Sequence, residues 1–199
     1  MARLSPLSRD AVADLDEDFA FFERTLGFVP NSLLTMARRP WLARGVIALS
    51  RGVYDPRGEV DLGLKRLIGH AASMAAGCLY CRAHTGTSAM RHGVPPEKLS
   101  ALPDYRTSPL YSDAERVAID FAFAAASQPN DVDDGLFQRL ATHFDEDQIV
   151  EILGVVGLFG FFNRWNDSMA TTLEPEPLAQ AQDHLAATGW RAGKHAPQT

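Results

Sequence analysis

Apolar residues recur along most of the chain at the three-to-four-residue spacing of amphipathic helices. No stretch sustains the alternation of apolar and polar residues that a half-buried strand requires. Clusters rich in proline, glycine, asparagine and aspartate separate the helical stretches and predict turns. The pattern therefore predicts an all-α helical bundle, with helices over residues 10–26, 32–39, 41–53, 61–76, 78–92, 113–127, 133–143, 146–173 and 177–188.

The same pattern predicts one all-helical domain over residues 1–199, with a cysteine-bearing half over about 1–100. Glu151 precedes Asn163 by the same twelve residues that separate Arg66 from Cys78. The second half, over about 101–175, therefore reads as a degenerate copy of the first, which would form a second helical hairpin. A C-terminal tail follows over 176–199, and we expect its last ten residues to be disordered.

The amino-acid composition argues against several classes of function. The chain of 199 residues is 46% hydrophobic and 22% charged, which is enough apolar material for a normal core. Its net charge of -6 argues against a nucleic-acid surface. The longest apolar run, residues 152–162, is too short to span a bilayer, and the N-terminus lacks a signal-peptide pattern. We expect a cytoplasmic protein with no nucleic-acid or membrane partner.

The chain has only two cysteines, Cys78 and Cys81, and His84 follows three residues later. Residues three apart are neighbours on a helix, so the three side chains share one broad face. Two close thiols can cycle between dithiol and disulfide, and an imidazole beside them can carry the proton. The cysteines could instead be small core residues or half of a zinc site. No fourth ligand is evident in the sequence, so we expect no metal.

A helix followed by Gly77-Cys78-x-Tyr80-Cys81 resembles the carboxymuconolactone decarboxylase superfamily, on its alkylhydroperoxidase D-like, peroxidase-related branch. Residues 26–31, Leu-Gly-Phe-Val-Pro-Asn, are similar to the N-terminal region of that branch, and residues 162–167 are similar to its C-terminal signature. The resemblance covers roughly residues 15–175 and implies the alkylhydroperoxidase D-like helical bundle and a homo-oligomer.

The chain departs from the family pattern at the histidine. The family histidine lies four residues after the second cysteine, where this chain has Thr85, and His84 comes one residue early. On an ideal helix this shift turns the imidazole by about 100°, toward Cys81 and away from Cys78. We expect His84 either to lower the pKa of Cys81 or to supply a proton to the leaving oxygen.

The chain departs from the family pattern a second time, at the position of the proton-relay glutamate. That position, twelve residues before the first cysteine, holds Arg66, which cannot act as a base. His70 follows one turn later on the same face, and Glu151 keeps the glutamate position of the second half. Either residue could complete a proton relay.

The resemblance implies a thiol-dependent alkylhydroperoxide reductase in which Cys81 attacks the peroxide and Cys78 closes a redox-active disulfide, with no other cofactor. Helix-terminus electrostatics alone would favour Cys78 as the attacking thiolate, so the order stays open. A hydroperoxide substrate and a dithiol reductant protein are the expected partners. Two alternatives remain: a lactone decarboxylase, and a non-catalytic protein that uses the disulfide as a redox switch.

Overall fold

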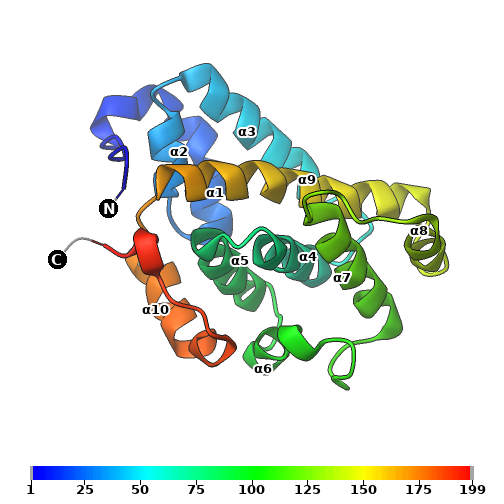
Figure 1. Cartoon of the computed structure of the whole chain (residues 1–199). Helices are drawn as coiled ribbons and strands as arrows, with labels where there is room; N and C mark the ends of the chain where they lie inside the picture. Colours follow the sequence, from blue (N-terminus) through cyan, green and yellow to red (C-terminus); the bar gives the residue numbers. More distant parts are fainter. Residues whose placement is uncertain (1, 198–199) are drawn as a thin grey trace.

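A computed structural model describes residues 2–197, and this part of the chain contains helices and no strand, as the sequence predicts. Residues 2–197 form ten α-helices and four short 3-10 helices, and Figure 1 shows how they are arranged. Their bounds are η1 (Asp10–Leu15), α1 (Asp16–Leu26), α2 (Asn31–Met36), α3 (Pro40–Val53), α4 (Leu62–Ala75), α5 (Leu79–Arg91), α6 (Pro96–Ser100), η2 (Leu102–Asp104), α7 (Asp113–Ala126), α8 (Asp134–Ala141), α9 (Glu146–Met169), α10 (Pro175–His184), η3 (Ala186–Thr188) and η4 (Gly193–His195).

The long helix α9 crosses the molecule and lies between two groups of helices (Figure 1). On one side α4, α5 and α7 pack against it around a core that includes Ile68 and Val155. On the other side α1, α2 and α3 enclose a smaller core that includes Phe19 and Ile47. Phe162 of α9 packs against both cores, so the two apolar groups meet at the C-terminal half of this helix.

The first residues of the helices lie close to the starts that the sequence predicts, because the capping interactions that begin a helix are local. Ser112 and Glu115 form a capping box at α7, and Asp145 and Gln148 form another at α9. The turn between α4 and α5 is made by Gly77 at φ +69°, which a residue with a side chain rarely adopts. Cys78 follows as the N-cap residue of α5, one position before the helical turn in which the sequence places it.

Helix α9 is unbroken, in agreement with the predicted helix over 146–173. Arg66 lies on α4 and Cys78 is the N-cap residue of α5, whereas Glu151 and Asn163 lie within the same 24-residue helix, so this pair of residues does not repeat the turn between α4 and α5. One face of α9 stays exposed, with Val150 at 71% and Leu153 at 49%. No helix within residues 2–197 combines the length and hydropathy needed to cross a membrane.

The expectation that the last ten residues are disordered is wrong for the part that the structure describes. Trp190 and His195 are buried. The indole Nε1 of Trp190 donates to the carbonyl of Leu79 at 2.9 Å, and the Leu173 amide donates to the carbonyl of His195 at 2.9 Å. These contacts hold the tail against the N-terminal end of α5; residues 198–199 lie outside the described part.

Candidate active site

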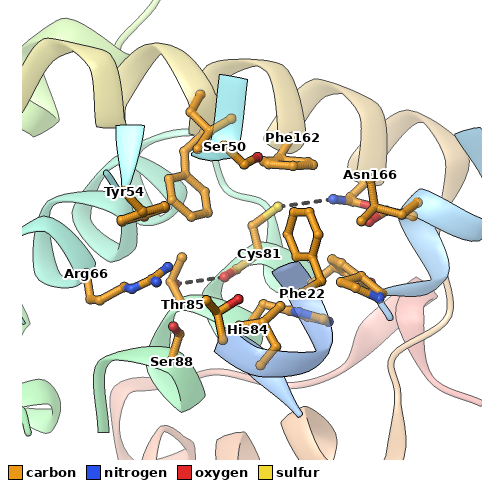
Figure 2. A pocket seen from close by; sticks show the side chains of 18 of the residues that line it. Phe22, Ser50, Tyr54, Arg66, Cys81, His84, Thr85, Ser88, Phe162 and Asn166 are labelled. Carbon is orange, nitrogen blue, oxygen red and sulfur yellow. Dashed lines mark hydrogen bonds between the residues drawn. The ribbon is translucent and has the colours of Figure 1, made fainter. Parts of the chain in front are cut away.

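An apolar pocket lies where the two cores meet, and Cys81 is part of its wall (Figure 2). Its interior, measured as the space open to the centres of water-sized molecules, is about 70 Å³. Side chains from α1, α2, α3, α4, α5 and α9 line it, and most of them are apolar or aromatic. The large apolar members are Phe21, Phe22, Leu26, Leu33, Leu158, Phe159 and Phe162.

The two cysteines occupy different environments although only two residues separate them. Cys81 faces the pocket, and Asn166 of α9 points its amide Nδ2 at the Cys81 sulfur from 3.5 Å (Figure 2). Cys78 does not line the pocket; its sulfur accepts the backbone N–H of Cys81 at 3.4 Å. Both are free thiols in the structure, and both are buried. Only Cys81 is therefore placed to meet a molecule bound in the pocket.

Of the two roles expected for His84, the first, a lowered pKa of Cys81, does not agree with the structure. Burial raises the pKa of the Cys81 thiol well above its usual value, and the hydrogen bond and charge of the Cys78 sulfur raise it further. The hydrogen bond from Asn166 acts in the opposite direction without outweighing burial. Cys81 is thus a thiol at rest, and it must lose its proton to a neighbouring group when it reacts.

His84 also lines the pocket, but its partner is a residue that the sequence did not single out. Its Nε2 lies 2.6 Å from Oε2 of Glu174, the N-cap residue of α10. The other carboxylate oxygen accepts the Tyr80 hydroxyl at 2.8 Å and the Asn31 amide at 2.6 Å. The Tyr80 ring stacks on the imidazole, with ring centroids 4.2 Å apart.

These contacts define the charge of Glu174 and the tautomer of His84. Burial acts to raise the pKa of Glu174, but the charge and hydrogen bond of His84, with the donors Asn31 and Tyr80, outweigh it and lower the pKa. A carboxylate only accepts hydrogen bonds, so Nε2 of His84 carries the proton that is shared with Glu174. Nδ1 is then the ring nitrogen that can exchange a proton with the pocket.

His70 supports the cysteine helix and does not bond a sulfur among the described contacts. The Thr85 hydroxyl donates to the carbonyl of Cys81 at 2.7 Å, so Nδ1 of His70, 2.8 Å away, donates to the Thr85 oxygen. Burial, with the nearby charge of Arg82, lowers the pKa of His70 to about 3. A neutral histidine in this position fixes the rotation of α5 but has no access to the pocket.

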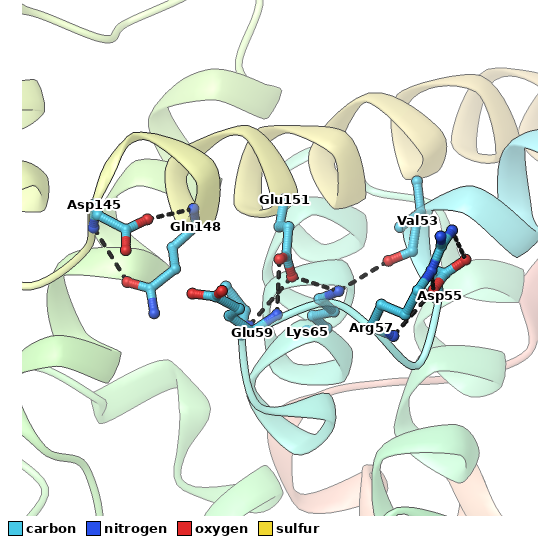
Figure 3. Close-up of polar contacts among 9 residues, drawn as sticks. Val53, Asp55, Arg57, Glu59, Lys65, Asp145, Gln148 and Glu151 are labelled. Carbon is cyan, nitrogen blue, oxygen red and sulfur yellow. Dashed lines mark hydrogen bonds and ion pairs between the residues drawn. The ribbon is translucent and has the colours of Figure 1, made fainter.

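Glu151 lies on the first part of α9 and does not line the pocket (Figure 3). Its carboxylate pairs with the buried ammonium of Lys65 at 2.7 Å and accepts the amides of Glu59 and Val60 at 2.8 and 3.2 Å. The structure thus brings His84 and Cys81 to one pocket, and it gives Glu151 a tethering contact to the loop before α4.

Arg66 reaches the pocket from α4 and brings a positive charge into its apolar wall (Figure 2). The residue is buried, and its guanidinium stacks on the ring of Tyr54 at 3.6 Å from the ring centroid. Its Nε has no hydrogen-bond partner among the described residues. A buried guanidinium whose Nε donor has no partner favours a ligand that carries negative charge or electron-rich atoms.

A second polar group lies on the other side of the cysteines. The sulfur of Cys78, a carboxylate oxygen of Asp167 and a ring nitrogen of His195 all lie within 4.8 Å of one another. Such a set could in principle hold a metal ion. The ammonium of Lys194, however, lies 2.8 Å from Oδ1 of Asp167, and a cation next to that carboxylate opposes metal binding.

Comparisons with known proteins agree with this architecture. The sequence profile described as "Carboxymuconolactone decarboxylase family" matches residues 40–124, which include both cysteines. The uncharacterized protein YnjA of Escherichia coli strain K12 is 34% identical over 73% of this chain and 80% of its own length.

Solved structures show the same fold. The debrominase Bmp8 is 35% identical in its complex with 2,3,4-tribromopyrrole, over 90% of this chain and 95% of that chain, with a TM-score of 0.85. A peroxidase-related protein from Silicibacter sp. TM1040 is 22% identical over 88% of this chain and 93% of that chain, with a TM-score of 0.77. The chain therefore belongs to the carboxymuconolactone decarboxylase family.

Proposed function

We propose that the protein is a thiol-dependent reductase of small organic molecules, in which Cys81 attacks the substrate and Cys78 completes a disulfide. The observation that carries this proposal is the placement of Cys81 in the pocket, with Cys78 directly behind it at the start of α5. A sulfur that meets the substrate and a second sulfur shielded from it suit a two-step exchange. The placement supports Cys81, rather than Cys78, as the attacking residue.

The substrate that we propose first is an organic hydroperoxide. The Cys81 sulfur bonds to the terminal oxygen of the hydroperoxide, and the O–O bond breaks. The proton of the Cys81 thiol passes through Nδ1 of His84 to the departing alkoxide. This step yields an alcohol and a sulfenic acid on Cys81. The Cys78 thiol loses its proton, its sulfur bonds to the Cys81 sulfur, and the hydroxide that leaves takes up a proton from solvent and becomes water. A dithiol reductant restores both thiols, and no other cofactor is needed.

Glu174 would prepare His84 for this role. The carboxylate holds the Nε2 proton at 2.6 Å and stabilises the positive charge that develops when Nδ1 accepts the proton of Cys81. The pairing of a histidine with a buried carboxylate is the usual way in which a protein orients an imidazole base. It would compensate for the high pKa that burial imposes on Cys81.

The pocket favours a substrate larger than hydrogen peroxide. Aromatic and aliphatic side chains together form most of the wall, and a wall of this kind binds planar or branched apolar groups. The guanidinium of Arg66 adds one site for a negatively charged or electron-rich substituent. We infer a compact, ring-bearing molecule with such a substituent.

The second candidate reaction is reductive removal of a halogen from a ring, which the similarity to a debrominase favours. The Cys81 sulfur would take the halogen, while the ring carbon keeps the bonding electrons and gains a proton. Cys78 would then attack the Cys81 sulfur, and halide would leave with the electron pair. The two reactions use the same cysteines, the same disulfide and the same reductant. They differ in the atom that the Cys81 sulfur attacks, which is the terminal oxygen of a hydroperoxide in one reaction and the halogen in the other.

A substrate panel tests the proposal. Cumene hydroperoxide, hydrogen peroxide, a bromopyrrole and a bromophenol would each be incubated with the enzyme and dithiothreitol, dihydrolipoamide or thioredoxin. Loss of the dithiol together with formation of alcohol or debrominated ring supports the reductase. Variants Cys81→Ser and Cys78→Ser should both lose turnover. Turnover that survives Cys81→Ser would contradict the proposal, and disulfide formation without turnover of any substrate would favour the redox-switch alternative.

A further inference from the structure

The C-terminal tail brings a buried histidine to the cysteine that does not face the pocket. The atoms that Cys78, Asp167 and His195 present to one another all lie within 4.8 Å. Nε2 of His195 lies 3.8 Å from Oδ1 of Asp167, and the His195 side chain is 0% exposed. Cys78 is equally buried. These groups come from α9, the N-cap of α5 and η4.

Hydrogen bonding defines which ring nitrogen of His195 can accept a proton. Nδ1 lies 2.8 Å from the carbonyl oxygen of Thr171, which only accepts hydrogen bonds, so Nδ1 carries a hydrogen. Burial lowers the pKa of His195, with a contribution from the charge of Lys194, and the ring is therefore neutral at neutral pH. Its lone pair is on Nε2, and that atom is buried without a hydrogen-bond partner among the described residues.

Cys78 requires such an acceptor. The second step of the proposed reaction removes the proton of Cys78, and the side chain is fully buried away from water. The backbone N–H of Cys81 already donates to the Cys78 sulfur, and the start of α5 favours negative charge there. These contacts stabilise the thiolate but give its proton no destination.

We propose that His195 is the general base that receives the proton of Cys78 when Cys78 closes the disulfide, and that Asp167 stabilises the resulting imidazolium. This inference rests on the proposed function. The S–S bond forms as the bond between the Cys81 sulfur and its oxygen or halogen breaks, and the leaving group takes the electron pair. The proton moves from Cys78 to Nε2 of His195. Asp167, whose side chain is 46% exposed, then passes this proton from His195 to solvent.

The charged and titratable surroundings are compatible with this route. Lys194 pairs with Asp167 at 2.8 Å, on the solvent side of the group. The Tyr80 ring lies 5.8 Å from His195, but its hydroxyl is committed to Glu174. Cys81, three residues after Cys78, is the other reactant. His195 thus combines an acceptor atom that has no hydrogen-bond partner among the described residues with a nearby thiol that must be deprotonated.

A disulfide reagent that is not a substrate tests the step independently of the proposed function. Cys81 attacks dipyridyl disulfide and releases one thiopyridone, and Cys78 then attacks the Cys81 sulfur and releases the second; both releases are followed by stopped-flow absorbance. We expect His195→Gln to slow the second release about 100-fold and to leave the first within about twofold. The second release should be nearly independent of pH in the unmodified chain. In the variant it should rise about tenfold per pH unit.

The matched control is Trp190→Phe, which removes the contact of the tail with Leu79 but keeps His195. Asp167→Asn should slow the second release by a smaller factor, roughly three- to tenfold. An unchanged second release in His195→Gln would overturn the inference, and so would an equal slowing in Trp190→Phe, because loosening of the tail would then explain the effect. If the reagent results hold while no substrate in the panel turns over, the proposed function fails and the role of His195 stands.

Discussion

Replacement of Glu174 by glutamine tests the contacts that hold His84 in place. The carboxylate accepts three hydrogen bonds, from His84 at 2.6 Å, Asn31 at 2.6 Å and Tyr80 at 2.8 Å. A glutamine keeps one oxygen acceptor and turns the other atom into a donor, so at least one buried donor loses its partner. Hydrogen bonds to charged groups contribute about 1.5–3 kcal/mol each. We expect Glu174→Gln to lower the free energy of unfolding by about 2–4 kcal/mol.

For a chain of this size, that loss corresponds to a decrease in Tm of roughly 5–15 °C. The matched control is Glu176→Gln, the same change two residues later. Glu176 pairs with Arg91 where both side chains are about two-fifths exposed, at 43% and 38%. Exposed pairs contribute at most about 1 kcal/mol, so the control should barely move the transition. Urea unfolding followed by circular dichroism measures both variants.

The dependence of the free energy of unfolding on pH gives a second test of the role of Glu174. The pKa of Glu174 is lower in the folded protein, so its contribution is fully present above the unfolded-state pKa of about 4.3 and is lost as pH falls through the folded-state value. The difference in stability between the unmodified chain and Glu174→Gln should therefore shrink at acid pH. Equal losses in Glu174→Gln and Glu176→Gln, or a difference that does not change with pH, would refute the reasoning.

Three further predictions address the cysteines, the pocket and the assembly. Mild peroxide should reduce the count of free thiols from two to none without a covalent dimer on a non-reducing gel, because Cys78 and Cys81 are neighbours; persistent thiols would exclude the redox function. Arg66→Met should weaken calorimetric binding of benzoate about tenfold or more but leave benzamide unchanged, since only the anion gains a charged hydrogen bond; equal weakening would contradict this. Light scattering should show at least a dimer, because Val150 and Leu153 leave an apolar face exposed on α9; a monomer would count against it.

The sequence predicts the helices well because their signals are local. The capping boxes at Ser112 and Asp145, the apolar spacing and the break at Gly77 each depend on residues within a few positions. The short α6 was not predicted, since five residues after two prolines carry no helical periodicity. The continuous α9 agrees with the predicted helix over 146–173, but the repeat read from the spacing of Glu151 and Asn163 does not recur in the structure, because equal spacing does not reveal whether a turn lies between two residues.

The site could be predicted only in part. Cys78, Cys81 and His84 are found from their spacing, because all three lie at the start of one helix. Glu174 and His195 were not found, since the fold brings them to the cysteine helix across about a hundred residues of chain and no local pattern marks them. The pKa of Cys81 was wrongly expected to be low, because burial in the pocket outweighs the electrostatics that a sequence can suggest.

The central claim is that Cys81 meets the substrate and Cys78 resolves the intermediate. Intact-mass measurement of the two single-cysteine variants, after one equivalent of organic hydroperoxide, tests it most directly. The account predicts that Cys78→Ser gains the mass of one oxygen on Cys81, because the sulfenic acid forms and no second thiol removes it. It predicts that Cys81→Ser stays unmodified on the same timescale, since Cys78 does not reach the pocket. Oxidation of Cys81→Ser at Cys78, with Cys78→Ser unchanged, would contradict the account.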